Sequence, residues 1–152
     1  MMGNMDDEPE QKPLAEAEVQ QHILSLLPKE DFDLIITHNP LGEYTRHIRH
    51  EEIGKAVINL WEEGNISTHA LWVFAFEDGN KNYLPRPIEN LTLLQPLSDN
   101  IWSKKFNIIT KTYGFSLDSW EAKTTPKTEA FFEFKDAKAA KKWMNELLEH
   151  TV

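Results

Sequence analysis

Two short apolar runs, separated by an amphipathic helical pattern, constrain the fold of this chain more than any other feature. The runs cover residues 34–36 and 71–76 and do not alternate with polar residues, which is typical of parallel strands buried on both faces. Strand, helix and strand in this order predict a Rossmann-like α/β fold, an open and mostly parallel sheet with helices on both faces. The helical pattern ends at Gly64, a common residue after a helix, and consists of Ile53, Ala56, Val57, Leu60 and Trp61.

Three further helices are predicted on either side of this unit. One covers about residues 15–27 and is ended by Pro28, which supplies no amide hydrogen. Another begins at Ser98 or Asp99 and carries a stripe closed by Gly114, and the last follows Asp136 as its N-cap. Residues 129–134 are a short strand or the approach to that last helix. No repeat or linker divides the sequence, so a single domain over 1–152 is expected, with the polar residues 1–13 as a flexible lead-in.

Composition excludes several classes of function. With no cysteine, a metal site must use histidine and carboxylate ligands, and a cytoplasmic location is the natural expectation. The formal net charge of -9 disfavours nucleic acid as a partner, because scattered lysines and arginines form no basic tract. Neither a membrane partner nor a signal peptide is predicted, since no apolar stretch approaches the roughly 20 residues that cross a bilayer.

The loop after residue 37 is the place where chemistry is expected. Open parallel sheets bind ligands beyond the carboxyl ends of their strands, and this loop holds three of the six histidines, His38, His47 and His50. The spacing of His47 and His50 continues the stripe of the following helix, so both rings should face the sheet. A helix N-terminus disfavours a charged imidazolium, and the neutral ring is the form that binds a metal. A core histidine bonded to a backbone carbonyl is the alternative, and Glu51 and Glu52 fit ordinary helix-dipole complementarity equally well.

Several segments of this region together resemble a known family. Thr37-His38-Asn39-Pro40, Gly42-Glu43-Tyr44 and His47-x-x-His50 are similar to the second signature of the LmbE-like (PIG-L) zinc-dependent N-deacetylases. The similarity continues through residues 71–79, the helix of Trp102, residues 113–115 and residues 119–121.

The resemblance implies a hydrolase that removes the acetyl group from N-acetylated amino sugars of the GlcNAc type. In that family zinc is held by a histidine and an aspartate of an N-terminal His-Pro-Asp-Asp motif and by the second histidine of His-x-x-His, which corresponds to His50. The first histidine, matching His47, would be catalytic, stabilising the oxyanion or protonating the leaving amine. Zinc held by three ligands lowers the pKa of its bound water and polarises the amide carbonyl.

Two departures from the family pattern qualify this expectation. Thr45-Arg46 stands where the pattern has a single glycine, and no His-Pro-Asp-Asp occurs, since Asp6-Asp7 lacks the adjoining His-Pro. Two of the three expected ligands are therefore missing, and the chain should correspond to the C-terminal portion of the family domain. Weak zinc binding is expected, with activity requiring a complementing N-terminal segment, and iron or cobalt would also accept such ligands. Strands left without neighbours should promote homo-oligomer formation or aggregation.

A second hypothesis comes from another class of function. The chain would be a non-catalytic sugar-binding or protein-interaction module with the same fold, using Trp72, Tyr83 and Trp120 as contacts. Burial in the core is the alternative explanation for these aromatic residues, above all for Trp72, which lies within a predicted strand.

Overall fold

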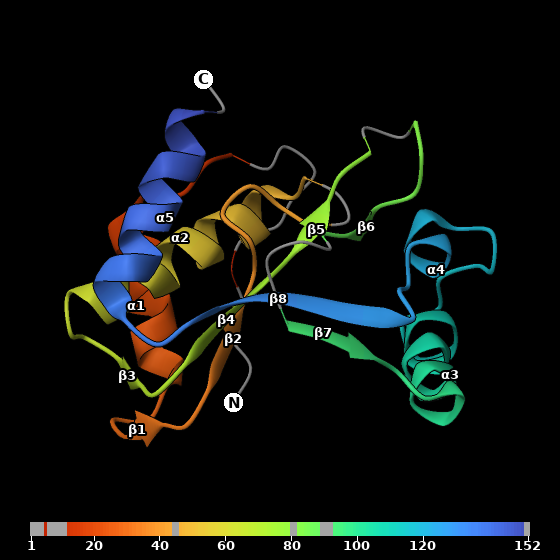
Figure 1. The fold of residues 1–152 in the computed structure, drawn as a ribbon, viewed down its shortest axis with the longest axis horizontal. Coiled ribbons are helices and arrows are strands. Elements are labelled where there is room, and N and C mark those ends of the chain that lie inside the picture. Colours follow the sequence, from red (N-terminus) through yellow and green to blue (C-terminus); the bar gives the residue numbers. More distant parts are fainter. Residues whose placement is uncertain (1–4, 6–11, 44–45, 80–81, 89–92, 151–152) are drawn as a thin grey trace. The chain divides into compact units, whose positions relative to one another are not determined.

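The computed structural model describes residue 5 and residues 12–43, 46–79, 82–88 and 93–150 as a mixed α/β structure (Figure 1). The predicted flexible lead-in falls mostly outside these residues. They group into two compact units, which are taken in turn. None of the described helices is long and apolar enough to cross a membrane. The first unit holds the first four strands of the chain together with α1 (Glu16–Leu26), α2 (Ile48–Glu62) and α5 (Ala137–Glu149).

Parallel strand pairs form the sheet structure of the first unit. β2 (Ile35–Thr37) pairs with β4 (Leu71–Phe74), and the shorter β1 (Asp31–Phe32) pairs with β3 (Ser67–Thr68). The helix α2 lies between β2 and β4 in the sequence. The predicted order of strand, helix and parallel strand is therefore confirmed.

The burial of β2 differs from the expectation. In β4 the side chains of Leu71 and Val73 are fully buried, but in β2 the side of the strand that carries Ile36 is open, with this residue 49% exposed. Successive side chains of a strand point to opposite faces, so Ile36 and the buried Thr37 face opposite ways. The prediction that residues 34–36 are buried on both faces is wrong, because only one face of this three-residue strand is covered.

The helices of the first unit end where their sequence signals place them. The apolar run of α1 stops at Leu26, two residues before Pro28. Gly64 follows α2 with φ 75°, and the amides of Gly64 and Asn65 bond back to the carbonyls of Trp61 and Leu60, which is a Schellman motif. Asp136 caps α5 by accepting a hydrogen bond from the amide of Ala139.

A buried asparagine joins the three helices of this unit. α2 packs against both α1 and α5, which lie beside it in Figure 1. Its buried residues include Ile58 and Leu60. Asn59 lies on this helix, donates to the carboxylate of Glu16 on α1 and accepts from the ammonium of Lys141 on α5. A buried amide is tolerated when both its donor and its acceptor are satisfied, so this contact sets how the helices pair.

The second unit is built from antiparallel pairs and short helices. β5 (Phe76–Glu77) pairs with β6 (Arg86–Pro87), and β7 (Leu93–Pro96) pairs with β8 (Thr128–Phe134). Ser98 caps the first helix, as predicted, by accepting from the amide of Ile101. The helical turns then widen into a π-helix, which the apolar stripe did not predict. The helical elements of this unit are α3 (Asp99–Asn107), the π-helix η1 (Ile108–Thr112) and α4 (Trp120–Lys123).

Candidate metal centre

A tight turn at the end of β2 positions the first histidine of the site. His38 directly follows the last residue of β2, and Asn39 next to it is buried. The side-chain amide of Asn39 donates to the carbonyl of Phe74 at 2.9 Å, and its oxygen accepts from the amide of Leu41 at 2.9 Å. Asn39 thereby ties the carboxyl ends of β2 and β4 together and reverses the chain at Gly42, where φ is 88°.

The first turn of α2 supplies the other two histidines. His47 is the N-cap residue of the helix, with extended φ and ψ, and His50 lies one turn further on. Gly54 on the same helix lies against the end of β2, because a Cβ atom added there would be 2.5 Å from the carbonyl oxygen of His38. The absence of a side chain at this position lets α2 approach the strand end closely enough for the rings to meet.

The three imidazoles form a compact cluster. The rings of His38 and His50 are stacked, with centroids 3.9 Å apart and planes inclined by 10°. The ring of His47 lies 4.9 Å from that of His50, and Phe74 closes the cluster at 6.1 Å from His38. All three histidines are half-buried, so their nitrogens are neither fully hydrated nor sealed in the core.

A carboxylate completes a set of three possible ligands. Glu43, from the loop that joins β2 to α2, is only 2% exposed. One ligand atom from each of His38, Glu43 and His50 lies within 4.8 Å of the others. Since zinc bonds nitrogen and carboxylate oxygen at about 2.0 to 2.2 Å, two ligands of one ion are separated by up to about 4.4 Å. The three donors are close to the spacing that a single divalent ion needs, and two imidazoles with one carboxylate are a ligand set that such ions accept.

The sequence identified one member of this set as a metal ligand. His50 was expected from the family resemblance, whereas His38 and Glu43 were only parts of the motif. The positions of His38 and Glu43 in the sequence could have indicated their role, because residues just beyond a parallel strand lie at the ligand-binding edge of a sheet. Spacing alone does not show which of these side chains turn inward.

Two arginines close to the histidines in the sequence are paired with glutamates of α2. Arg49 is buried, forms an ion pair with Glu52 at 2.6 Å and donates to the carbonyl of Lys12 at 2.8 Å. Arg46 forms a two-bond pair with Glu51 at 2.9 and 3.0 Å. Glu51 and Glu52 thus offset positive charge next to the site, which would otherwise repel a cation, and neither belongs to the donor set.

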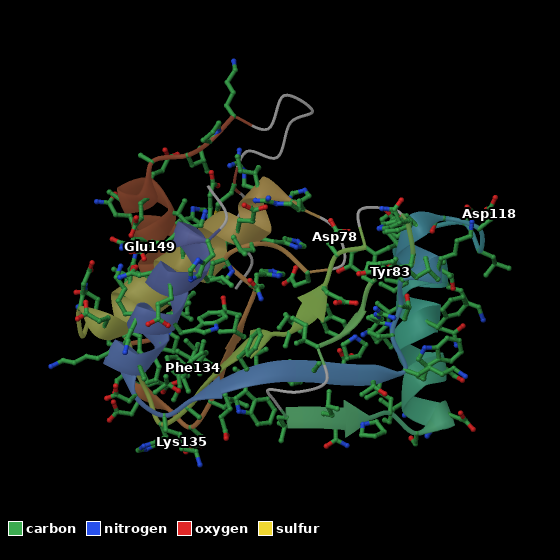
Figure 2. The ribbon with its side chains drawn as sticks, turned by 45° about the horizontal axis from the view of Figure 1, so that its top comes forward. Asp78, Tyr83, Asp118, Phe134, Lys135 and Glu149 are labelled. Atoms are coloured by element: carbon green, nitrogen blue, oxygen red, sulfur yellow. The ribbon has the colours of Figure 1, made fainter. Side chains whose placement is uncertain are left out.

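The aromatic residues proposed as sugar contacts do not share one unit. Trp72 lies in β4 of the first unit, half-buried, and its indole nitrogen donates to Glu133 at 3.2 Å. Tyr83 and Trp120 belong to the second unit. Tyr83, labelled in Figure 2, is 44% exposed, and the guanidinium of Arg86 lies 4.7 Å from its ring centroid. Arg86 also hydrogen-bonds the carboxylate of Glu77 and lowers the pKa of that group.

Comparison with known proteins finds no relative of this chain. No family model matches the chain, and no curated protein or solved structure matches it either. Membership of the family that the 37–50 motif resembles therefore stays an expectation based on the residues of that motif. The case for a metal centre rests on the arrangement of the donor atoms of His38, Glu43 and His50.

Proposed function

We propose that this chain is the metal-binding part of a zinc-dependent amide hydrolase that acts on N-acetylated amino sugars of the GlcNAc type. His38, Glu43 and His50 would hold the ion, and an N-terminal segment would complete the catalytic site. The observation that carries the proposal is the convergence of these three donors at the end of β2, with His47 beside them. The β2–α2–β4 unit would belong to a Rossmann-like, mostly parallel sheet, as in the family that the 37–50 motif resembles.

The residues of the cluster have distinct tasks in this proposal. A zinc ion bound there would polarise the amide carbonyl and supply an activated water. His38 and His50, whose ring centroids lie 3.9 Å apart, would each offer a ring nitrogen to the ion, and Glu43 would offer a carboxylate oxygen. The neighbouring ring of His47 is within 4.9 Å of His50 and would protonate the leaving amine or stabilise the oxyanion.

Metal binding is the first step to test, because it does not depend on the substrate. Titration of the full chain with zinc, followed by calorimetry, should give one equivalent bound. We expect His38→Ala or His50→Ala to weaken binding by at least about tenfold, and Glu43→Gln to weaken it less. The matched control is His69→Ala, since His69 is exposed and outside the cluster. Zinc binding that is absent, or equally affected by all four substitutions, would contradict the site.

Activity is tested separately from binding. Release of free amine from N-acetylglucosamine should require zinc and fall by about 10²- to 10⁴-fold in His47→Ala, while zinc affinity changes little. If the chain alone is inactive, addition of a segment carrying His-Pro-Asp-Asp should restore turnover. If zinc binds but no turnover is seen, either with the chain alone or with the added segment, the metal site would stand and the hydrolase activity would be rejected.

The alternative is a non-catalytic sugar-binding module, and the exposed ring of Tyr83 is the observation that favours it. An aromatic face that is accessible to solvent can stack on a sugar ring, and Arg86 beside it can donate hydrogen bonds to hydroxyl groups. Sugar titration monitored by NMR should then perturb residues near Tyr83 without added metal, and Tyr83→Ala should abolish the shifts. Perturbation confined to the histidine cluster would reject this alternative.

A further inference from the structure

The second unit exposes an ordered apolar loop that none of its described elements covers. Every residue from 111 to 118 is exposed, including Tyr113 at 71% and Leu117 at 73%. This segment begins with the last two residues of η1 and runs towards α4, and Figure 2 labels its final residue, Asp118. Apolar side chains scattered singly over a surface are ordinary, but a contiguous group marks an interaction site. We call residues 111–118 the apolar loop.

Internal hydrogen bonds hold the apolar loop in shape. The amide of Phe115 bonds to the carbonyl of Ile109, and Gly114 takes a positive φ of 79°. The hydroxyl of Ser116 donates to the carboxylate of Asp118 at 2.6 Å, and the amide of Ser119 bonds to the carbonyl of Ser116 at 3.0 Å. A surface that is ordered before binding loses little conformational entropy when a partner covers it.

The charge around the apolar loop differs in sign from that of the rest of the chain. Residues 98–127 contain five lysines and three carboxylates, which gives this segment a net charge of +2. Because the whole chain carries -9, the rest of the chain carries -11. Within the loop Lys111 and Asp118 are both exposed and offset each other, and the Asp118 carboxylate already accepts from Ser116, so the positive balance comes from the residues that flank the loop. A partner for this surface should therefore combine an apolar depression with negative charge.

Such a depression is present on the first unit. A cavity of about 670 Å³ lies between the end of α1, β1 and residues 64–67, within the range of about 300 to 1,000 Å³ typical of concave binding sites. The carboxylates of Glu30 and Asp31 line it and are exposed, with Lys29 as the single positive group. Its apolar lining is formed by Leu24, Leu27, Phe32 and Ile66. We call this the α1 groove.

We propose that the apolar loop of one molecule docks into the α1 groove of a second copy of this chain. Tyr113, Phe115 and Leu117 would fill the apolar part of the groove, and Lys111 would approach its carboxylates. The two surfaces differ, so each molecule keeps one loop and one groove for further partners. Head-to-tail contacts of this kind produce rings or open chains rather than simple two-fold dimers.

Sedimentation velocity of the full chain over a range of concentrations tests the contact. The wild-type protein should show a mass that rises with concentration. We expect Leu117→Asp in the loop and Leu24→Asp in the groove each to remain at the monomer mass of 17.7 kDa. Both residues are exposed, so neither change should prevent folding, which circular dichroism would check. The matched control is Leu84→Asp, at an exposed leucine outside both surfaces, which should associate as the wild type does.

Mixing the two monomeric variants gives the sharpest result. Leu117→Asp retains its groove and Leu24→Asp retains its loop, so an equimolar mixture should form a species of about twice the monomer mass and nothing larger. A wild-type protein that stays monomeric would overturn the proposal, as would a mixture that stays monomeric. Association lost in Leu117→Asp but kept in Leu24→Asp would show that the loop packs on itself. Binding of a monomeric protein to anionic vesicles through Leu117 would assign the loop to a membrane surface instead.

Discussion

Helices α2 and α3 were predicted from the same kind of apolar periodicity, yet they differ in burial. Eight of the 15 residues of α2 are buried, whereas none of the nine residues of α3 is. Contacts of α3 are made at its edge, where the indole nitrogen of Trp102 donates to the carbonyl of Thr125 at 3.4 Å and Lys105 pairs with Glu129. An apolar stripe therefore predicts that a helix forms, but not that other parts of the chain cover it.

The largest expected effect is a difference in the free energy of unfolding between matched isoleucine substitutions on these two helices. Ile58 on α2 is fully buried, so Ile58→Ala should reduce the free energy of unfolding by about 2 to 5 kcal/mol through lost burial and a cavity. Ile101 on α3 is 48% exposed, and Ile101→Ala should cost less than about 0.5 kcal/mol. Urea denaturation followed by circular dichroism measures both. Equal losses would mean that α3 is covered in solution.

Two arginines test whether the ion pairs with glutamates of α2 are also held by burial. Arg49 is enclosed with Glu52, so Arg49→Ala should cost about 3 kcal/mol by leaving a carboxylate without its charged partner. Arg46 pairs with Glu51 while its side chain is 55% exposed, and Arg46→Ala should cost about 0 to 1 kcal/mol. Added salt should reduce only the smaller effect. A loss at Arg46 as large as that at Arg49 would contradict the difference in burial.

A glycine tests the close approach of α2 to the strand end. In Gly54→Ala the added methyl group would collide with the carbonyl of His38, and the free energy of unfolding should fall by about 1 to 3 kcal/mol. Zinc affinity should fall as well, because His38 and His50 would separate. Lys55→Ala on the same helix should leave both quantities nearly unchanged. A stabilised Gly54→Ala protein would show that helix propensity outweighs the contact.

Local signals in the sequence predicted most elements of the first unit and their ends. Pro28, Gly64 and Asp136 act on their own neighbourhood, through a missing amide, a positive φ and a cap, so their effects could be read without knowledge of the fold. The position of His50 in the first turn of a helix beyond a parallel strand followed from the same reasoning. Ile36 shows the limit of such patterns, because its exposure depends on which elements cover each face of β2.

The sequence by itself determined the helices α1, α2, α3 and α5, the two parallel strands on either side of α2, and which loop carries the histidines. The tertiary structure alone decided that His38 stacks on His50, that Glu43 joins them, that no residue of α3 is buried, and that the apolar loop is exposed. The physical reason is the range of the interactions involved. Backbone hydrogen bonds and caps act over about four residues, whereas burial and ligand geometry depend on contacts between segments that are distant in the chain.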